Sequence, residues 1–212
     1  MAEYEIKAPF SEEEIRKLHA GDIVYISGDI MTLRDMAYSR TLEAIDAGKK
    51  LPFELKDRAI WHAGPITRPI GDNKWEAVCV GSTTSSRFTS VAAELIRKSG
   101  LRVIIGKGLM GKATQDALQK FGGVYVVTTG GAAAYYGDRI KEVKDVHWLD
   151  LGMPAACWEF KADRIGPLTV AIDSHGNCIF DQLEKDVDER IDNILDEYKV
   201  DKNHNYLWWP KP

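Results

Sequence analysis

Three short segments of this sequence concentrate groups that bind small anions. Gly81-Ser82-Thr83-Thr84-Ser85-Ser86-Arg87 joins a run of hydroxyls to a guanidinium, and Lys107 stands between two glycines twenty residues after that arginine. Arg34-Asp35 adds a second arginine. A guanidinium can bind a carboxylate through two parallel hydrogen bonds, and glycine lets backbone N–H groups approach the same anion closely. The set predicts a site for a small dicarboxylate.

Each segment also has a plainer structural interpretation. The hydroxyls of residues 83–86 are typical helix caps, with Arg87 as a solvated residue of the first helical turn. Gly106-Lys107-Gly108 fits an ordinary surface turn, and Arg34-Asp35 fits an ion pair at a helix end. The complete phosphate-loop pattern G-x-x-x-x-G-K-[ST] is absent, as is a G-x-S-x-G elbow. Neither a nucleotide site nor a hydrolase of that type is indicated.

The cysteines and histidines show no metal-site spacing. Cys79, Cys157 and Cys178 are odd in number and widely separated, which fits reduced thiols better than a disulfide framework. A complete zinc or iron–sulfur site within this chain is therefore not expected. The histidines are interpreted as structural or exposed residues: His19, His62, His147, His175 and His204.

Composition limits the classes of partner. The 212 residues, 44% of them hydrophobic, are enough for one substantial core with a tail. A formal charge of -4 and a pI of about 5.8 argue against a nucleic-acid partner bound by an overall basic surface. No run approaches the roughly 20 apolar residues that span a bilayer, and the first residues do not resemble a secretory signal. We expect a cytoplasmic protein without a membrane partner.

Hydrophobic periodicity predicts the elements that position the candidate groups. Ser11-Glu12-Glu13-Glu14 is a capping box that starts a helix running to about residue 20. An apolar run at 23–26 predicts a strand, and apolar residues recur at helical spacing over 32–47. Prolines and glycines in 49–73 indicate short strands and turns.

From residue 75 onward, strands and helices alternate regularly. Apolar runs at 77–80, 103–105 and 124–127 each predict a strand, and the first two are followed by helices that should end at Gly100 and Gly122. This alternation implies parallel strands joined by right-handed crossovers, and therefore an α/β fold. The candidate segments would lie at the carboxyl ends of strands, where α/β sheets bind ligands.

The C-terminal third has a different pattern. Apolar runs at 168–172 and 178–180 around a polar turn predict a β-hairpin. An acidic helix should follow over about 182–198, and a tail with Trp208 and Trp209 would serve for docking or packing. The chain is thus divided into an N-terminal helical segment (1–20), a main domain (21–180) and an acidic helix with its tail (181–212).

Together these segments resemble the β subunit, or C-terminal domain, of the class I iron–sulfur hydro-lyases, fumarase and L-tartrate dehydratase. The similar region runs from about residue 21 to 180. Six segments in one order carry the resemblance: 32–40, His62-Ala63-Gly64-Pro65, 81–87, Ile105-Gly106-Lys107-Gly108, Gly130-Gly131-Ala132-Ala133, and Leu151-Gly152-Met153 before an Ala-Ala-Cys-Trp run.

The resemblance implies a swivelling β/β/α domain with a largely parallel central sheet and flanking helices. Such a domain closes over a [4Fe–4S] cluster held by a separate α subunit, and two copies would pair within a heterotetramer. The implied reaction is the reversible hydration of fumarate to malate, with dehydration of L-tartrate or a related hydroxy acid as the alternative. By similarity, Thr83 is the candidate base, and the residues that bind the substrate carboxylates are Arg34, Thr84, Arg87 and Lys107.

Four positions depart from the family pattern. The family usually has histidine at the position of Tyr38, methionine and aspartate in place of Phe88 and Thr89, and glutamate in place of Pro154. The cationic residues are intact, so dicarboxylate binding is expected. A non-catalytic dicarboxylate-binding or regulatory module is the alternative from another functional class, motivated by Tyr38 and Pro154.

Overall fold

The computed structural model describes residues 1–72 and 74–200, which divide into two compact units. The first unit comprises residues 1–178 and contains every candidate site residue. The described part of the second unit holds one long helix, α6 (Ile179–Glu197), close to the predicted acidic helix. Trp208 and Trp209 lie outside the described residues. No helix in the described ranges is both long and apolar enough to cross a membrane.

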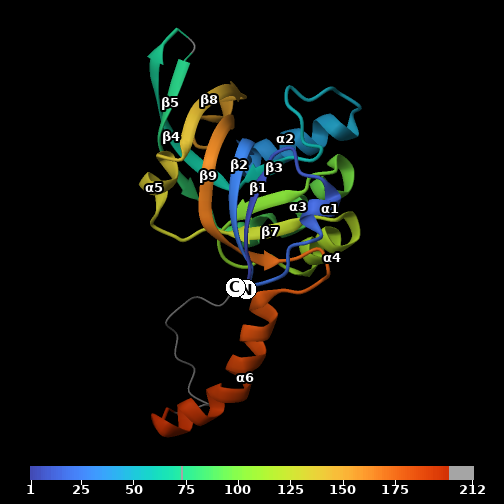
Figure 1. Cartoon of the computed structure of the whole chain (residues 1–212), viewed down its shortest axis with the longest axis vertical. Helices are drawn as coiled ribbons and strands as arrows, with labels where there is room; N and C mark the ends of the chain where they lie inside the picture. Colours follow the sequence, from blue (N-terminus) through green and yellow to red (C-terminus); the bar gives the residue numbers. More distant parts are fainter. Residues whose placement is uncertain (73, 201–212) are drawn as a thin grey trace. The chain divides into compact units, whose positions relative to one another are not determined.

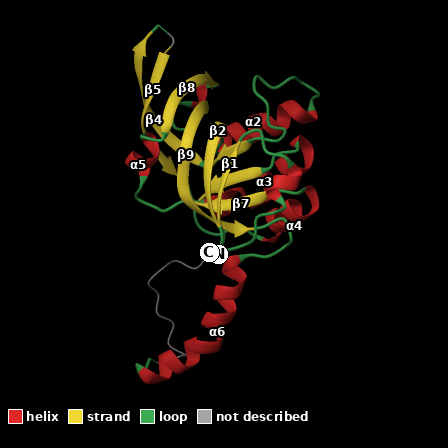
Figure 2. Ribbon diagram, in the orientation of Figure 1, coloured by secondary structure: helices red, strands yellow, loops and turns green. Residues whose placement is uncertain are grey.

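A seven-stranded sheet forms the centre of the first unit (Figures 1 and 2). Its strand order is β1-β2-β3-β6-β7-β9-β8, and β2 also pairs with β9. The strands between these two partners therefore form a closed, barrel-like ring of β2, β3, β6, β7 and β9. The bounds of the seven strands are β1 Glu3–Lys7, β2 Ile23–Thr32, β3 Ala59–Trp61, β6 Val103–Gly106, β7 Val124–Val127, β8 Ile140–His147 and β9 Cys157–Ile172.

Strand direction corrects one part of the sequence prediction. The α/β class is confirmed, and the pairs β1–β2, β2–β3, β3–β6 and β6–β7 are parallel. However, the sixteen-residue β9 runs antiparallel to β2, β7 and β8, so the sheet is mixed rather than largely parallel. Because β9 joins both ends of the ring, most backbone N–H and C=O groups of the inner strands find partners within the sheet.

A separate hairpin corrects a second prediction. The run 77–80 belongs to β5 (Lys74–Ser82), which pairs antiparallel with β4 (Ala63–Gly71) in a two-stranded sheet and not with the central strands. Val78 is 48% exposed, whereas Val80 is buried, so this apolar run lies only partly in the core. The hairpin register places Gly64 opposite Gly81, which brings the hydroxyl-rich turn beside the end of β3.

The flanking helices agree closely with the periodicity. α3 (Thr89–Ser99) packs against both α2 (Asp35–Asp46) and α4 (Lys112–Phe121), and Figure 1 shows the three along one side of the sheet. The predicted stops are confirmed, since Gly100 and Gly122 take the left-handed conformation with φ of 72° and 70°. The remaining short helical elements are α1 Glu12–Ile15, α5 Ala133–Gly137 and the 3₁₀ turns Ser85–Phe88 and Leu149–Leu151.

Two local predictions need adjustment near the ends of the first unit. The Ser11 cap is confirmed, because its Oγ accepts a hydrogen bond from the Glu14 N–H at 3.1 Å, but α1 ends at Ile15 and β1 precedes it. The predicted C-terminal hairpin is wrong beyond a single bridge between Ile172 and Cys178, because residues 179 and 180 begin α6. The Asp173 carboxylate accepts hydrogen bonds from N–H groups of the intervening turn, which fixes that turn without a second strand.

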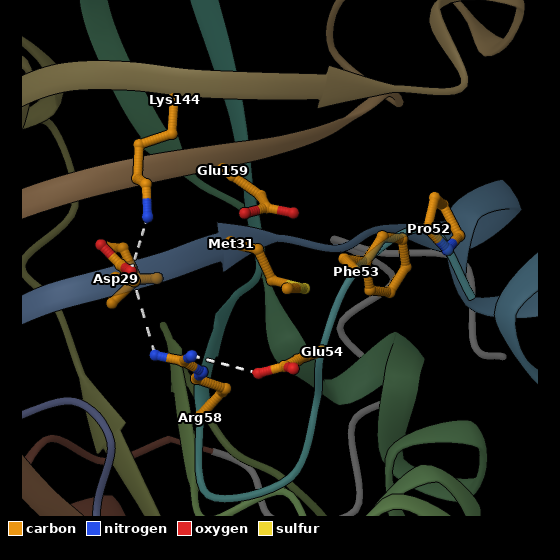
Figure 3. Close-up of a pocket in the computed structure, with 9 residues that line it drawn as sticks. Asp29, Met31, Pro52, Phe53, Glu54, Arg58, Lys144 and Glu159 are labelled. Carbon is orange, nitrogen blue, oxygen red and sulfur yellow. Dashed lines mark hydrogen bonds and ion pairs between the residues drawn. The ribbon is translucent and has the colours of Figure 1, made fainter. Parts of the chain in front are cut away.

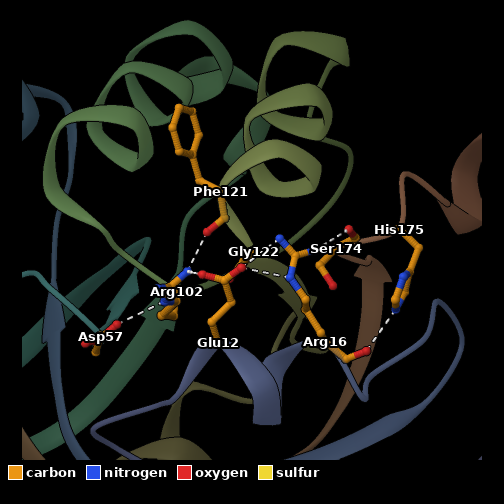
Figure 4. Close-up of polar contacts among 8 residues, drawn as sticks. All are labelled: Glu12, Arg16, Asp57, Arg102, Phe121, Gly122, Ser174 and His175. Carbon is orange, nitrogen blue, oxygen red and sulfur yellow. Dashed lines mark hydrogen bonds and ion pairs between the residues drawn. The ribbon is translucent and has the colours of Figure 1, made fainter.

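A charged cluster ties α1 to the end of α4 (Figure 4). The Arg102 guanidinium donates to the carbonyls of Phe121 and Gly122, the last acceptors of α4. It also pairs with Glu12 at 3.1 Å and with Asp57 at 3.0 Å. A cation at a helix C-terminus satisfies free carbonyls and interacts favourably with the helix dipole. Only 14% of this side chain is exposed, so solvent screens these interactions weakly.

We predict that Arg102→Ala lowers the free energy of unfolding by about 2 kcal/mol, because it leaves two carbonyls and two carboxylates without their shared donor. Urea denaturation followed by circular dichroism measures this change. Arg97→Ala is the matched control, since the Arg97 side chain is 57% exposed and, in the part of the chain that the structure describes, pairs with its helix neighbour Glu94. Equal stability of the two variants would contradict the prediction.

Candidate functional site

The structure brings the three candidate segments to one region of the first unit. Arg34 follows β2, the hydroxyl-rich turn follows β5, and Lys107 follows β6. Thr84 and Lys107 form an isolated parallel bridge, and the Ser85 N–H donates to the Lys107 carbonyl at 3.0 Å. Ends of strands that are far apart in sequence therefore meet at one rim.

Arg34 is held by the backbone around it. Its Nη1 donates to the Pro154 carbonyl at 3.3 Å, so this departure from the family pattern contributes a main-chain acceptor. A Cβ on Gly64 would lie 2.6 Å from the same Nη1, which means that the guanidinium needs a glycine there. The Arg34 Nε is buried and has no hydrogen-bond partner among the described residues. The exposed donors of this guanidinium are therefore its Nη groups, and the Nε remains an unpaired buried donor.

The two arginines converge on one carboxylate. The Asp35 Oδ2 lies 3.3 Å from the Arg87 Nη2 and 3.8 Å from the Arg34 Nη2. Both guanidinium groups are thus close enough to share a single carboxylate. Half of the Arg87 side chain is exposed, compared with a quarter of the Arg34 side chain, so the shared region is open on the Arg87 side.

Lys107 and the two threonines complete the predicted set. Lys107 is partly buried, and within residues 1–72 and 74–200 its ammonium has no ion-pair partner. Thr83 is partly buried, and its backbone N–H donates to the His62 carbonyl at 2.6 Å. Thr84 is exposed beside Lys107. The described part of the chain offers the Thr83 hydroxyl no hydrogen-bond partner, so any base that activates it must come from elsewhere.

His62 is the residue of this region that the sequence interpretation missed. It is completely buried, and its Nε2 lies 2.6 Å from the Tyr38 hydroxyl and its Nδ1 2.9 Å from the Ser85 Oγ. Burial lowers the pKa of His62 to about 3, so the imidazole is neutral at physiological pH. Its position directly after the β3 strand, as for Arg34 after β2, was the available sequence signal.

Two departures from the family pattern contact His62 and each other. The Phe88 ring lies 4.6 Å from the His62 ring and stacks 5.5 Å from the Tyr38 ring, measured between centroids. The Arg87 guanidinium lies 5.2 Å from the Phe88 centroid, a cation–π distance. Tyr38, His62 and Phe88 therefore form an aromatic cluster, and Arg87 packs on it through the Phe88 ring. Thr89, also a departure from the family pattern, contacts the start of α4 instead. Its Oγ1 accepts a hydrogen bond from the Gly111 N–H at 3.0 Å.

A separate cavity of about 290 Å³ contains none of these residues (Figure 3). Its charges are already neutralised within the protein. Asp29 pairs with Lys144 at 2.7 Å and with Arg58 at 3.9 Å, and Arg58 also pairs with Glu54. Glu159, which faces the same cavity, accepts a hydrogen bond from His147 at 2.9 Å. The cavity thus offers no cation comparable to the Arg34, Arg87 and Lys107 set.

The described residues include no group of three His, Cys, Asp or Glu side chains that could hold a metal ion. Cys157 and Cys178 are buried, Cys79 is partly buried, and none of the three forms a disulfide within the described residues. Burial raises the pKa of the Cys157 thiol, which disfavours the thiolate that a metal needs. The described residues of this chain therefore do not fit an iron–sulfur cluster.

The buried His62 predicts a specific pH dependence of stability. In the unfolded chain the His62 imidazole takes up a proton near pH 6.5. In the folded protein the same imidazole stays neutral down to about pH 3. Stability should therefore fall by about 1.4 kcal/mol for each pH unit below 6.5, until the folded pKa is reached. Urea denaturation between pH 7 and pH 4.5 measures the slope, and His62→Gln should flatten it. An imidazole NMR signal of His62 that titrates near pH 6.5 would disprove the prediction.

Comparisons with known proteins agree with the resemblance. A family model described as "Fumarase C-terminus" matches residues 2–183. The chain is 40% identical to the putative L(+)-tartrate dehydratase subunit beta of Methanocaldococcus jannaschii, over 87% of this chain and 95% of that protein. It is 38% identical to the L(+)-tartrate dehydratase subunit beta of Escherichia coli K12, over 91% and 94%.

A longer relative covers the same domain. The chain is 38% identical to a putative class I fumarate hydratase of Geobacillus stearothermophilus, over 88% of this chain but only 35% of that protein. One family thus includes separate β subunits and longer single chains. With the family model covering most of its length, the chain belongs to the fumarase C-terminal family, among the β subunits of tartrate dehydratase and class I fumarase.

Proposed function

We propose that this chain supplies the dicarboxylate clamp of a hydro-lyase that interconverts fumarate and malate. The observation that carries the proposal is the convergence of the Arg34 and Arg87 guanidinium groups on one carboxylate, that of Asp35. In the proposal a substrate carboxylate takes the place of the Asp35 carboxylate between the two arginines. Lys107, which has no ion-pair partner in the described ranges, binds the second carboxylate.

The chemistry explains why cations are needed at this place. Removing a proton from the carbon next to a carboxylate spreads negative charge onto that carboxylate in the transition state. Fixed cations stabilise this added charge more than they stabilise the ground state, and that difference lowers the barrier. The Pro154 carbonyl and Gly64 hold Arg34 in place before substrate arrives, so little reorganisation is required.

Thr83 is the candidate base of the proposal. A threonine hydroxyl is a weak base, and the described residues provide no group that would activate it. The activating group would therefore come from a partner chain that covers this surface. The names of the relatives, which are "subunit beta", support such a partner. A [4Fe–4S] cluster held by an α subunit supplies, when bound, a Lewis acid for the substrate hydroxyl.

Dehydration of L-tartrate is the second candidate function. The relatives that match this chain over 94–95% of their own length are named as tartrate dehydratase subunits, which favours it. Tartrate and malate share two carboxylates at the same spacing, so the same clamp serves both acids. The two reactions differ in the hydroxyl on the carbon that loses the proton.

We predict that Arg87→Ala and Lys107→Ala each lower turnover at least about a hundredfold, the scale of losing one charge-stabilising donor. The assay is anaerobic, uses this chain co-purified with its α-type subunit, and follows the double-bond absorbance of fumarate. Lys17→Ala is the control, because Lys17 is exposed outside the three candidate segments, and its ion-pair partner among the described residues is Glu13. Wild-type kinetics in either site variant would remove that residue from the clamp.

The wild-type complex separates the candidate functions when each acid is supplied in turn and the consumption of that acid is followed. Turnover of fumarate only in the presence of both subunits supports the proposed hydratase. Turnover of tartrate without turnover of fumarate selects the second candidate. A confirmed complex with an intact cluster that acts on neither acid would favour the non-catalytic module.

We predict that Gly64→Ala disables the clamp without unfolding the protein. The added Cβ would lie 2.6 Å from the Arg34 Nη1, which is the end of a flexible side chain and can move aside. The Michaelis constant for the dicarboxylate should rise about tenfold or more, because Arg34 loses its place. Gly130→Ala is the matched control, since its Cβ would meet nothing within 4 Å. Unchanged kinetics in Gly64→Ala would show that Arg34 does not bind substrate.

A further inference from the structure

We infer that a buried, one-directional chain of hydrogen bonds through His62 positions the clamp, by linking the helix that follows Arg34 to the turn that carries Lys107. This inference rests on the proposed function, because it assigns a task to residues beneath the same site. The members of the chain are Tyr38, His62 and Ser85, and Tyr125, beside Ser85 at Gly106, extends it to the Gly108 carbonyl. We call it the His62 chain.

Hydrogen-bond satisfaction fixes the direction of the His62 chain. Tyr38 is fully buried, and among the described residues its hydroxyl has only the His62 Nε2 as a partner, so the O–H must donate to that nitrogen. The neutral imidazole then carries its proton on Nδ1 and donates it to the Ser85 Oγ, 2.9 Å away. The tautomer is thus determined by the tyrosine.

The second half of the His62 chain continues in the same direction. The Ser85 hydroxyl, having accepted from His62, is left to donate toward Tyr125, whose ring borders the same space at Gly106. The Tyr125 hydroxyl donates to the Gly108 carbonyl at 2.8 Å. In this order the O–H of Tyr38, the N–H of His62 and the O–H of Tyr125 each have an acceptor. A buried network that is fully satisfied is rigid, whereas one missing member leaves a costly unpaired group.

The contacts of the His62 chain reach each part of the clamp. Tyr38 lies on α2, one helical turn after Arg34, and its N–H donates to the Arg34 carbonyl at 2.7 Å. The His62 carbonyl accepts from the Thr83 N–H at 2.6 Å. Ser85 exchanges two hydrogen bonds with the Lys107 backbone, at 3.0 and 3.3 Å. A shift of any member would change the spacing between the cations.

The surroundings of Gly106 show how closely the members of the His62 chain are packed. A Cβ at this position would lie 2.0 Å from the Ser85 Oγ, 3.1 Å from the Tyr125 ring and 3.2 Å from the His62 Nδ1. Only glycine leaves room for the three partners to meet. The glycine before Lys107 thus makes space for the His62 chain beneath the turn, in addition to any role toward an anion above it.

Ser85→Ala tests the inference, because it removes the central hydroxyl and keeps a small side chain. In the co-purified complex we expect the Michaelis constant for the dicarboxylate to rise about tenfold, since misplaced cations bind the substrate poorly. Tyr125→Phe, which removes only the last donor, should act in the same direction. Ser90→Ala is the matched control, because Ser90 is exposed on α3 and lies outside both the anion-binding segments and the His62 chain.

The pattern of kinetic constants distinguishes positioning from folding. A purely structural role would reduce the active fraction, and hence kcat, with an unchanged Michaelis constant. That result in both Ser85→Ala and Tyr125→Phe would overturn the inference. A complex that turns over no dicarboxylate at all would contradict the proposed function instead, and the following spectroscopic measurement would still test the chain.

Nitrogen-15 NMR of the full chain, labelled at histidine, reads the tautomer directly. We expect the His62 signals to show a protonated Nδ1 and an unprotonated Nε2. In Tyr38→Phe, which removes the donor to Nε2, this preference should be lost. A proton on Nε2 in the unaltered chain would reverse the direction of the hydrogen bonds and overturn the inference.

Discussion

Closure of the sheet by β9 is the constraint on which the site depends. This strand pairs with β2 at one end of the ring and with β7 at the other. The strands between β2 and β7 therefore cannot move independently of one another. The loop before β9 carries Pro154, whose carbonyl binds Arg34, and Thr32 at the end of β2 accepts from the Trp158 N–H at 3.1 Å. The strand that closes the barrel thus also fixes the arginine at its rim.

The buried polar groups beneath the rim are more restricted in position than the apolar side chains of the core. Large buried side chains such as Trp61 and Phe160 stabilise the barrel through area removed from water, and this contribution tolerates small rearrangements. Tyr38 and His62 are equally buried, but leaving one of their polar atoms unpaired costs about 1–3 kcal/mol. Their positions are therefore specified by direction as well as by volume.

Some of this arrangement could be predicted from the sequence. Helix stops at Gly100 and Gly122 depend on local backbone geometry, and the strand at 103–105 is a short buried run, so local patterns sufficed. The position of β5 could not be predicted, because a four-residue apolar run reads the same in a central strand and in a hairpin. The pairing of β9 with β2 joins residues more than a hundred positions apart, and no local signal records it.

The same distinction applies to the site. The sequence allowed the selection of Arg34, Arg87 and Lys107, because a cation that follows a strand end can bind an anion whatever its neighbours are. His62 also follows a strand end, but that position alone did not select it, because its role depends on its partners, Tyr38 and Ser85, which are separated from it by 24 and 23 positions. A histidine without metal-ligand spacing is most simply interpreted as a core residue. In this protein the core residue also sets the geometry of the surface above it.

The exposure of the clamp limits what this chain can do alone. Two unit charges 4 Å apart attract by about 1 kcal/mol in bulk water, but by about 4 kcal/mol at an effective dielectric constant of 20. Half of the Arg87 side chain is in contact with water, so the arginines of the free chain act near the weaker limit. A partner surface that covers the rim would exclude water and strengthen each of these interactions several-fold. In the proposed function the open rim and the preorganised cations are complementary, since a site assembled between two chains needs one rigid half and a second half that closes it.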